Sequence, residues 1–128
     1  MDIDAPDLGP WLDQADDASL NALPNGVIGI DADGKACRYS DYEAEMAGFD
    51  PRDVLGRHFF EEIGVCMNNG LVARRFADAQ LKNEPLDALI DYVIAFRSRR
   101  TPVKMRLLSS PSSPTRYLLI QRLLQEGQ

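Results

Sequence analysis

Apolar side chains along this chain gather into short runs, and five of these runs have the character of β-strands. Residues 26–31 are almost continuously apolar, whereas residues 103–108 largely alternate apolar and basic side chains. Both patterns indicate strands when they are short and rich in β-branched or aromatic residues. The predicted strands are residues 26–31, 35–39, 86–96, 103–108 and 117–123.

Turn and capping residues separate these strands. Asp33-Gly34 predicts a hairpin between the first two strands, because an Asp-Gly pair suits the tight turns that hairpins use. The acidic residues 1–23 carry sparse apolar anchors and predict two short helices, the second of them capped at Asp16-Asp17. The other predicted helices run from Ser40 to just before Gly48, from Asp50-Pro51 to Leu55, and over residues 71–83.

This order of elements predicts the fold class. Two strands, a helical crossover and three more strands give an α+β fold with an open five-stranded antiparallel sheet, helices on one face and an N-terminal helical cap. PAS sensor domains have this architecture. At 128 residues the chain is expected to form a single domain, with residues 1–24 as the cap and residues 25–128 as the PAS core.

Composition and charge exclude several classes of function. The net charge of −6 disfavours binding to nucleic acid or to anionic membranes. No apolar run reaches the roughly 18 residues of a membrane span, and the acidic N-terminus lacks the basic start of a secretory signal. We therefore expect a cytoplasmic protein.

The residues suited to metal binding and catalysis are few. One histidine (His58) and two cysteines (Cys37 and Cys66) supply neither a metal site, a c-type haem site nor a disulfide framework. No catalytic triad is supported, so we expect no enzyme. The basic cluster of Arg97, Arg99 and Arg100 is interpreted as a solvated hairpin turn and not as a binding patch.

Three side chains carry the candidate chemistry. Cys66 offers a thiol, Tyr39 a phenol, and Glu43 a carboxyl four residues after that phenol. A phenol has an ordinary pKa near 10, so an ionised phenolic ligand needs hydrogen-bond donors such as a tyrosine and a protonated carboxyl. Burial in an apolar site favours the protonated carboxyl. Together these groups suit a covalently attached phenolic acyl group.

The pattern resembles the photoactive yellow protein family of PAS-fold photoreceptors over nearly the whole chain. The cap residues together with Tyr39, Glu43 and Cys66 are its most specific part. The residues that carry the resemblance are Leu12, Asp16-Asp17, Leu20, Leu23, residues 26–31, Asp33-Gly34, Tyr39, Glu43, Gly48, Asp50-Pro51, Val54, Gly56, Phe59-Phe60, Cys66, Phe76, Tyr92, Thr101-Pro102 and Lys104.

The resemblance implies a blue-light receptor that carries 4-hydroxycinnamic (p-coumaric) acid as a thioester on Cys66. Tyr39 and Glu43 would hydrogen-bond the phenolate oxygen. Light would isomerise the double bond, Glu43 would give up its proton, and the cap would loosen into a signalling state. The expected pocket lining is Phe49, Val65 and Phe96, with Ile28 and Phe59 as further candidates.

Three single positions depart from the family's usual sequence, and residues 67–69 after the cysteine also differ from it. Ala47 stands where the family usually has Thr, Phe49 where it has Arg, and Val65 where it has Pro. The missing Thr removes a polar contact from the hydrogen-bond network, and the missing Arg removes a lid over the chromophore. An altered colour or photocycle is therefore expected.

Alternatives remain for both the residues and the function. Ser40 and Glu43 have capping-box spacing, in which the Glu43 side chain reaches back to the Ser40 N–H. The alternative for Cys66 is an inert buried thiol. The second functional hypothesis is a non-photoactive PAS domain that acts as a protein-interaction or dimerisation module, and an enzyme with Cys66 as nucleophile is least favoured. Under the first two, output passes to a separate signalling partner or through a homodimer.

Overall fold

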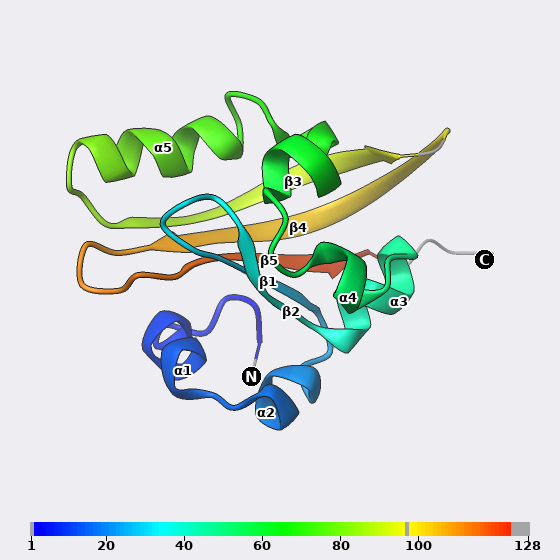
Figure 1. Ribbon diagram of the computed structural model, residues 1–128, viewed down its shortest axis with the longest axis horizontal. Coiled ribbons are helices and arrows are strands. Elements are labelled where there is room, and N and C mark those ends of the chain that lie inside the picture. Colours follow the sequence, from blue (N-terminus) through cyan, green and yellow to red (C-terminus); the bar gives the residue numbers. More distant parts are fainter. Residues whose placement is uncertain (1, 97, 124–128) are drawn as a thin grey trace.

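The structure is a computed structural model that describes residues 2–96 and 98–123, without the side chain of Phe96. Its five strands form one antiparallel sheet in the order β2-β1-β5-β4-β3, which confirms the predicted fold class (Figure 1). The elements are α1 (Leu8–Gln14), α2 (Asp17–Asn21), β1 (Gly26–Ile30), β2 (Ala36–Tyr39), α3 (Asp41–Ala47), α4 (Pro51–Val54), a π-helical turn (Phe59–Ile63), a 3-10 turn (Val65–Met67), α5 (Ala73–Leu81), β3 (Leu86–Phe96), β4 (Arg99–Ser109) and β5 (Arg116–Arg122).

The sheet separates two apolar cores, because successive side chains of a strand point to opposite faces. On β1, Ile28 and Ile30 belong to the larger core, together with Phe59, whereas Val27 belongs to the smaller core with Leu8 and Leu12 of α1. Figure 1 shows α1 and α2 on one side of the sheet and α5 on the other. The predicted N-terminal cap therefore covers the sheet face opposite to the one that the later helices cover.

Two arginines attach this cap to the sheet. Arg38 of β2 donates hydrogen bonds to the carbonyls of Leu12 and Ala15, both at 2.7 Å. Arg106 of β4 is buried and donates to the carbonyls of Ile3 and Ala5. Both arginines come from strands remote in sequence, so the cap is held by the sheet and not only by its own apolar residues.

Ser40 positions the start of α3 against the sheet. Its hydroxyl oxygen accepts a hydrogen bond from the Glu43 N–H at 3.3 Å, as an N-cap does, and another from the Val27 N–H at 2.9 Å. Gly48 ends the helix with a left-handed φ of 78°. The predicted bounds of this helix are confirmed, and its first turn is fixed to β1.

The segment between α4 and α5 was not predicted in detail. The π-helical turn at Phe59–Ile63 and the 3-10 turn at Val65–Met67 lie in a run that gave no clear period. Strand β4 also begins at Arg99, four residues before the predicted start, and it pairs with β3 from Phe96 onward. Arg97 and residues 124–128 lie outside the described residues.

Candidate functional site

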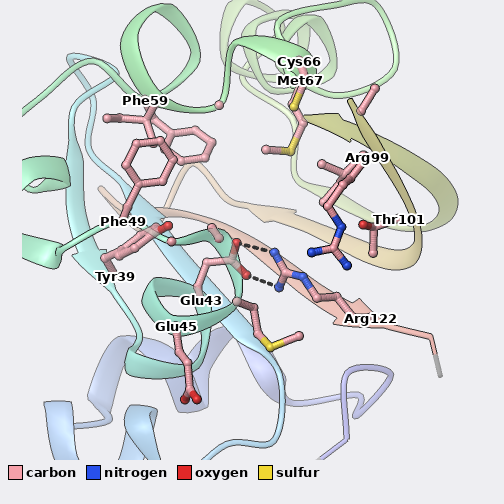
Figure 2. A pocket seen from close by; sticks show the side chains of 17 residues that line it. Tyr39, Glu43, Glu45, Phe49, Phe59, Cys66, Met67, Arg99, Thr101 and Arg122 are labelled. Carbon is pink, nitrogen blue, oxygen red and sulfur yellow. Dashed lines mark hydrogen bonds and ion pairs between the residues drawn. The ribbon is translucent and has the colours of Figure 1, made fainter. Parts of the chain in front are cut away.

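A cavity of about 520 Å³ lies between the helical elements and one end of the sheet. This volume is within the range of small-molecule sites in proteins. Side chains from widely separated parts of the chain form its wall, among them Tyr39, Glu43, Phe49, Phe59, Cys66, Ile94, Arg99, Thr101 and Arg122. Figure 2 shows Cys66 on one side of the cavity and Tyr39, Glu43 and Arg122 on the other.

Cys66 is held in the wall by its backbone. The Tyr92 hydroxyl donates a hydrogen bond to the Cys66 carbonyl at 2.8 Å, and the Asn69 amide donates to the same oxygen at 3.3 Å. Asn69 also donates to the Tyr92 hydroxyl at 2.7 Å, which closes a three-membered network. Burial raises the pKa of the Cys66 thiol, so the thiol keeps its proton at neutral pH. Sequence reasoning gave Tyr92 no such role.

Gly64 permits the close packing that precedes Cys66. A Cβ at this position would lie 2.6 Å from Cε2 of Phe59 and 2.9 Å from Cε of Met67. Real Cβ atoms do not approach other atoms so closely, so only glycine fits without a local shift. The turn that carries the thiol therefore lies directly against the Phe59 ring.

Tyr39 ends β2 beneath the cavity and is 8% exposed. Its burial raises the pKa of the phenol, the negative charge of Glu43 raises it further, and the Arg122 charge opposes this change. The hydroxyl therefore stays protonated over the physiological range. In that state Tyr39 is a hydrogen-bond donor for an anion in the cavity.

Glu43 makes a bidentate ion pair with Arg122 inside the wall. The guanidinium of Arg122 donates to Oε1 at 2.7 Å and to Oε2 at 2.9 Å, and the two side chains are 5% and 12% exposed (Figure 2). Burial alone would lower the pKa of Arg122, but the hydrogen bonds and charge of Glu43 outweigh it and raise this pKa. The geometry is that of a charge-assisted pair with two parallel N–H···O bonds.

This geometry corrects the capping-box interpretation of Glu43. The Ser40 N–H donates to the Val27 carbonyl, and the Glu43 carboxylate points to Arg122 instead of back to Ser40. Gly26 makes room for the carboxylate, since a Cβ there would lie 2.1 Å from Oε1 of Glu43. Glu43 thus faces the cavity, whereas its role as proton donor stays a prediction.

Sequence reasoning missed Arg122, although a signal was present. Leu118 and Ile120 of β5 lie in the larger core, on the sheet face that bears the cavity. Alternation along the strand places the next residue but one, Arg122, on the same face. A charged residue at the end of a strand, on the same face as buried apolar residues, indicates a polar partner on that face.

Only some of the remaining predicted lining residues belong to the cavity wall. Phe49 and Phe59 line the cavity, whereas Ile28 is fully buried in the core and is not part of the wall. Val65 is 57% exposed, because the 3-10 turn directs it outward, so its prediction as a lining residue is wrong. The side chain of Phe96 lies outside the described residues. Arg99 joins the wall and is not merely part of a solvated turn.

Comparisons with known proteins identify the fold and the family. A family model described as the PAS fold matches residues 15–117. Photoactive yellow protein from Halochromatium salexigens is 30% identical over 107 residues, which are 84% of this chain and 85% of that protein. The chain belongs to the photoactive yellow protein family. Photoactive yellow protein from Rhodobacter capsulatus is 31% identical over 108 residues, 82% of this chain and 84% of the relative.

The family assignment extends to a solved structure. The photoactive yellow protein domain of the sensor histidine kinase Ppr from Rhodospirillum centenum superimposes with a TM-score of 0.79 at 29% identity. The match covers 88% of this chain and 97% of that domain. Relatives in this family are non-enzymatic photoreceptors, so the chain is a photoactive yellow protein-like PAS photoreceptor domain.

Two searches of the described part of the chain complete the description of the site. Within residues 2–96 and 98–123, no group of three or more His, Cys, Asp or Glu side chains is placed to hold a metal ion. Over the same residues, no helix has the length and apolar character needed to cross a membrane.

Proposed function

We propose that this chain is a blue-light receptor that holds p-coumaric acid as a thioester on Cys66, with the phenolic ring directed toward Tyr39 and Glu43. The observation that carries the proposal is the shared cavity. A thiol lies on one side of it, and a phenol and a carboxyl group lie on the other, although Cys66 is far from Tyr39 and Glu43 in sequence. A phenolic acyl group has complementary chemistry at its two ends.

The residues of the wall fit this group. Cys66 provides the nucleophile for the thioester, and Phe49 and Phe59 provide an apolar surface for an aromatic ring. Tyr39 keeps its proton and so donates a hydrogen bond to a phenolate oxygen. When bound, the group supplies the absorption of blue light and a double bond that isomerises. The chain's contribution is to hold the ring and to exchange a proton with it through Glu43.

The proposed signalling state involves the N-terminal cap. The cap contacts the sheet through the small apolar core and through arginine bonds to its backbone carbonyls, such as those of Arg38. The cavity borders the larger core, which lies on the opposite face of the same sheet from the cap. We propose that loosening of the cap transmits the signal to a partner protein or to a second copy of the chain.

The test is a visible absorption spectrum after incubation with p-coumaric anhydride. We expect an absorption band red-shifted from the free acid, with a mass increase of one acyl group by intact-mass spectrometry. Cys66→Ala should lose both signals. Cys37→Ala is the matched control, because it removes the other thiol, which is exposed and not part of the cavity wall, and should keep both.

A negative result is equally informative. Absence of the band in folded protein with reduced Cys66 would reject the photoreceptor function. It would favour a PAS domain that acts as an interaction or dimerisation module.

A further inference from the structure

The Glu43–Arg122 ion pair leaves the acidic end of the cavity electrically balanced. One carboxylate faces one guanidinium, and both carboxylate oxygens accept hydrogen bonds from it. The other titratable groups near the pair are Tyr39 of β2, Tyr42 and Glu45 of α3, and Arg99 of β4. Tyr39 is neutral, and Glu45 and Arg99 are exposed, so water screens their charges.

An anionic ligand changes this balance. A phenolate brought to Tyr39 and Glu43 would place two negative charges beside one buried arginine. A buried charge without a partner is strongly unfavourable, and neighbouring like charges favour protonation of one of them. A proton from solvent restores the balance if it binds to Glu43, because the guanidinium is then free to face the phenolate.

The structure also indicates which side chain moves. Glu43 is attached to α3 and its carboxylate lies against Gly26, in a space that a single Cβ would fill. Arg122 is a long side chain on the last residue of β5 and lines the cavity. Exchange of partners by Arg122 therefore needs less rearrangement than movement of Glu43.

We propose that Arg122 is an exchangeable counter-ion: it pairs with the Glu43 carboxylate in the unloaded protein and with the phenolate oxygen in the loaded protein, while Glu43 takes up a proton from solvent. The only bond that forms in this exchange is the O–H bond of the Glu43 carboxyl. The loaded half of this statement rests on the proposed function, whereas the unloaded half concerns the chain alone. The exchange also accounts for the protonated Glu43 that the family resemblance implies.

The primary experiment is infrared spectroscopy of the carboxyl groups at neutral pH, with Glu43→Gln used to assign the Glu43 signal. Unloaded wild-type protein should show Glu43 as a carboxylate, without the carbonyl stretch of a protonated carboxyl. Unloaded Arg122→Gln should gain that stretch, because the carboxyl stays buried without its cation. Arg122→Lys keeps the charge and should retain the carboxylate.

Arg116→Gln is the matched control. This arginine lies at the other end of β5 and bonds to the Asp31 carbonyl and to Gln80, away from the cavity wall. Its removal should leave the Glu43 signal unchanged. If Arg116→Gln and Arg122→Gln both gained the stretch of a protonated carboxyl, the proposal would be overturned, since the change would then reflect general loosening of the strand.

Loaded protein provides the second readout. After reaction with p-coumaric anhydride, wild-type Glu43 should show the stretch of a protonated carboxyl that the unloaded protein lacks. The pH at which half of the bound phenol is protonated should rise by about 1 to 3 units in Arg122→Gln, because a nearby cation is lost. An unchanged Glu43 signal on loading would overturn the exchange, even if no Arg122 variant folds.

The two proposals fail differently. If no sample binds the acyl group, the photoreceptor function is rejected, but the unloaded spectra still decide whether Arg122 holds Glu43 ionised. If the acyl group binds and unloaded wild-type Glu43 is already protonated, the counter-ion proposal is rejected and the photoreceptor function stands.

Discussion

Gly26 offers a sharp test of the packing around the ion pair. In a Gly26→Ala variant the new methyl group would lie 2.1 Å from Oε1 of Glu43 and 3.1 Å from its Cδ. Ordinary contacts begin near 3.4 Å, so the carboxylate has to withdraw by about 1.3 Å. That displacement breaks the geometry of hydrogen bonds that are now 2.7 and 2.9 Å long.

The expected loss of unfolding free energy follows from two terms. Overpacking a tight site typically costs about 1–3 kcal/mol. Weakening a buried ion pair adds to this, although less than the roughly 3–5 kcal/mol of removing one partner outright. We therefore expect Gly26→Ala to lose about 2–4 kcal/mol, which is a large part of the stability of an ordinary domain but leaves it folded.

Urea unfolding at neutral pH measures this loss. Gly9→Ala is the control, because no atom beyond its two chain neighbours and the backbone of its own helix lies within 4 Å of its missing Cβ, and the change should alter stability by no more than about 0.5 kcal/mol. In a Glu43→Ala, Arg122→Leu background the Gly26→Ala change should cost much less, since the clashing carboxylate is gone. A loss below about 0.5 kcal/mol for Gly26→Ala alone, or an equal loss in both backgrounds, would refute the reasoning.

Two further predictions concern tyrosines. Tyr92→Phe removes the hydroxyl that donates to the Cys66 carbonyl, so we expect a loss of about 0.5–1.5 kcal/mol in urea unfolding and faster amide exchange in the 3-10 turn; unchanged exchange there would contradict the role of Tyr92 in holding this turn. Burial, assisted by the hydrogen bond to Asp13, raises the pKa of Tyr117 to about 12, above its ordinary 10. As the pH rises, the Tyr117 phenol of the unfolded chain loses its proton near pH 10, whereas that of the folded chain keeps it until about pH 12. The stability that Tyr117 contributes is therefore fully present below pH 10 and is lost between about pH 10 and 12. Tyr117→Phe should flatten the fall in stability across that range, and an equally steep fall would count against this assignment.

The fold was predictable because its signals are local. Strand alternation in residues 103–108 and the turn at Asp33-Gly34 depend on neighbouring residues alone. The caps at Asp16, Ser40 and Asp50 are also local, and each accepts the predicted type of backbone hydrogen bond. The π-helical turn was not predictable in this way, because its conformation depends on packing of Phe59 against the rest of the core.

The site was predictable only in part. Family resemblance pointed to Cys66, Tyr39 and Glu43, and the structure brings all three to one cavity. The same sequence left Glu43 divided between a capping role, which follows from its spacing to Ser40, and a proton-donor role, which follows from the family resemblance. The choice depends on Arg122, which lies 79 positions away and meets Glu43 only when β5 joins β1 in the sheet.

The placement of Arg122 also connects the cavity with the cap. Strand β5 lies between β1 and β4, and its side chains alternate between the two faces of the sheet. Leu118 and Ile120 face the core that bounds the cavity, whereas Tyr117 and Leu119 face the core beneath the N-terminal helices. The strand that ends in Arg122, the partner of Glu43, therefore also supplies part of the surface on which the cap packs. The Arg122 ion pair and part of the surface on which the cap packs lie on one strand of the sheet, which is the structural basis for the proposed transmission from the cavity to the cap.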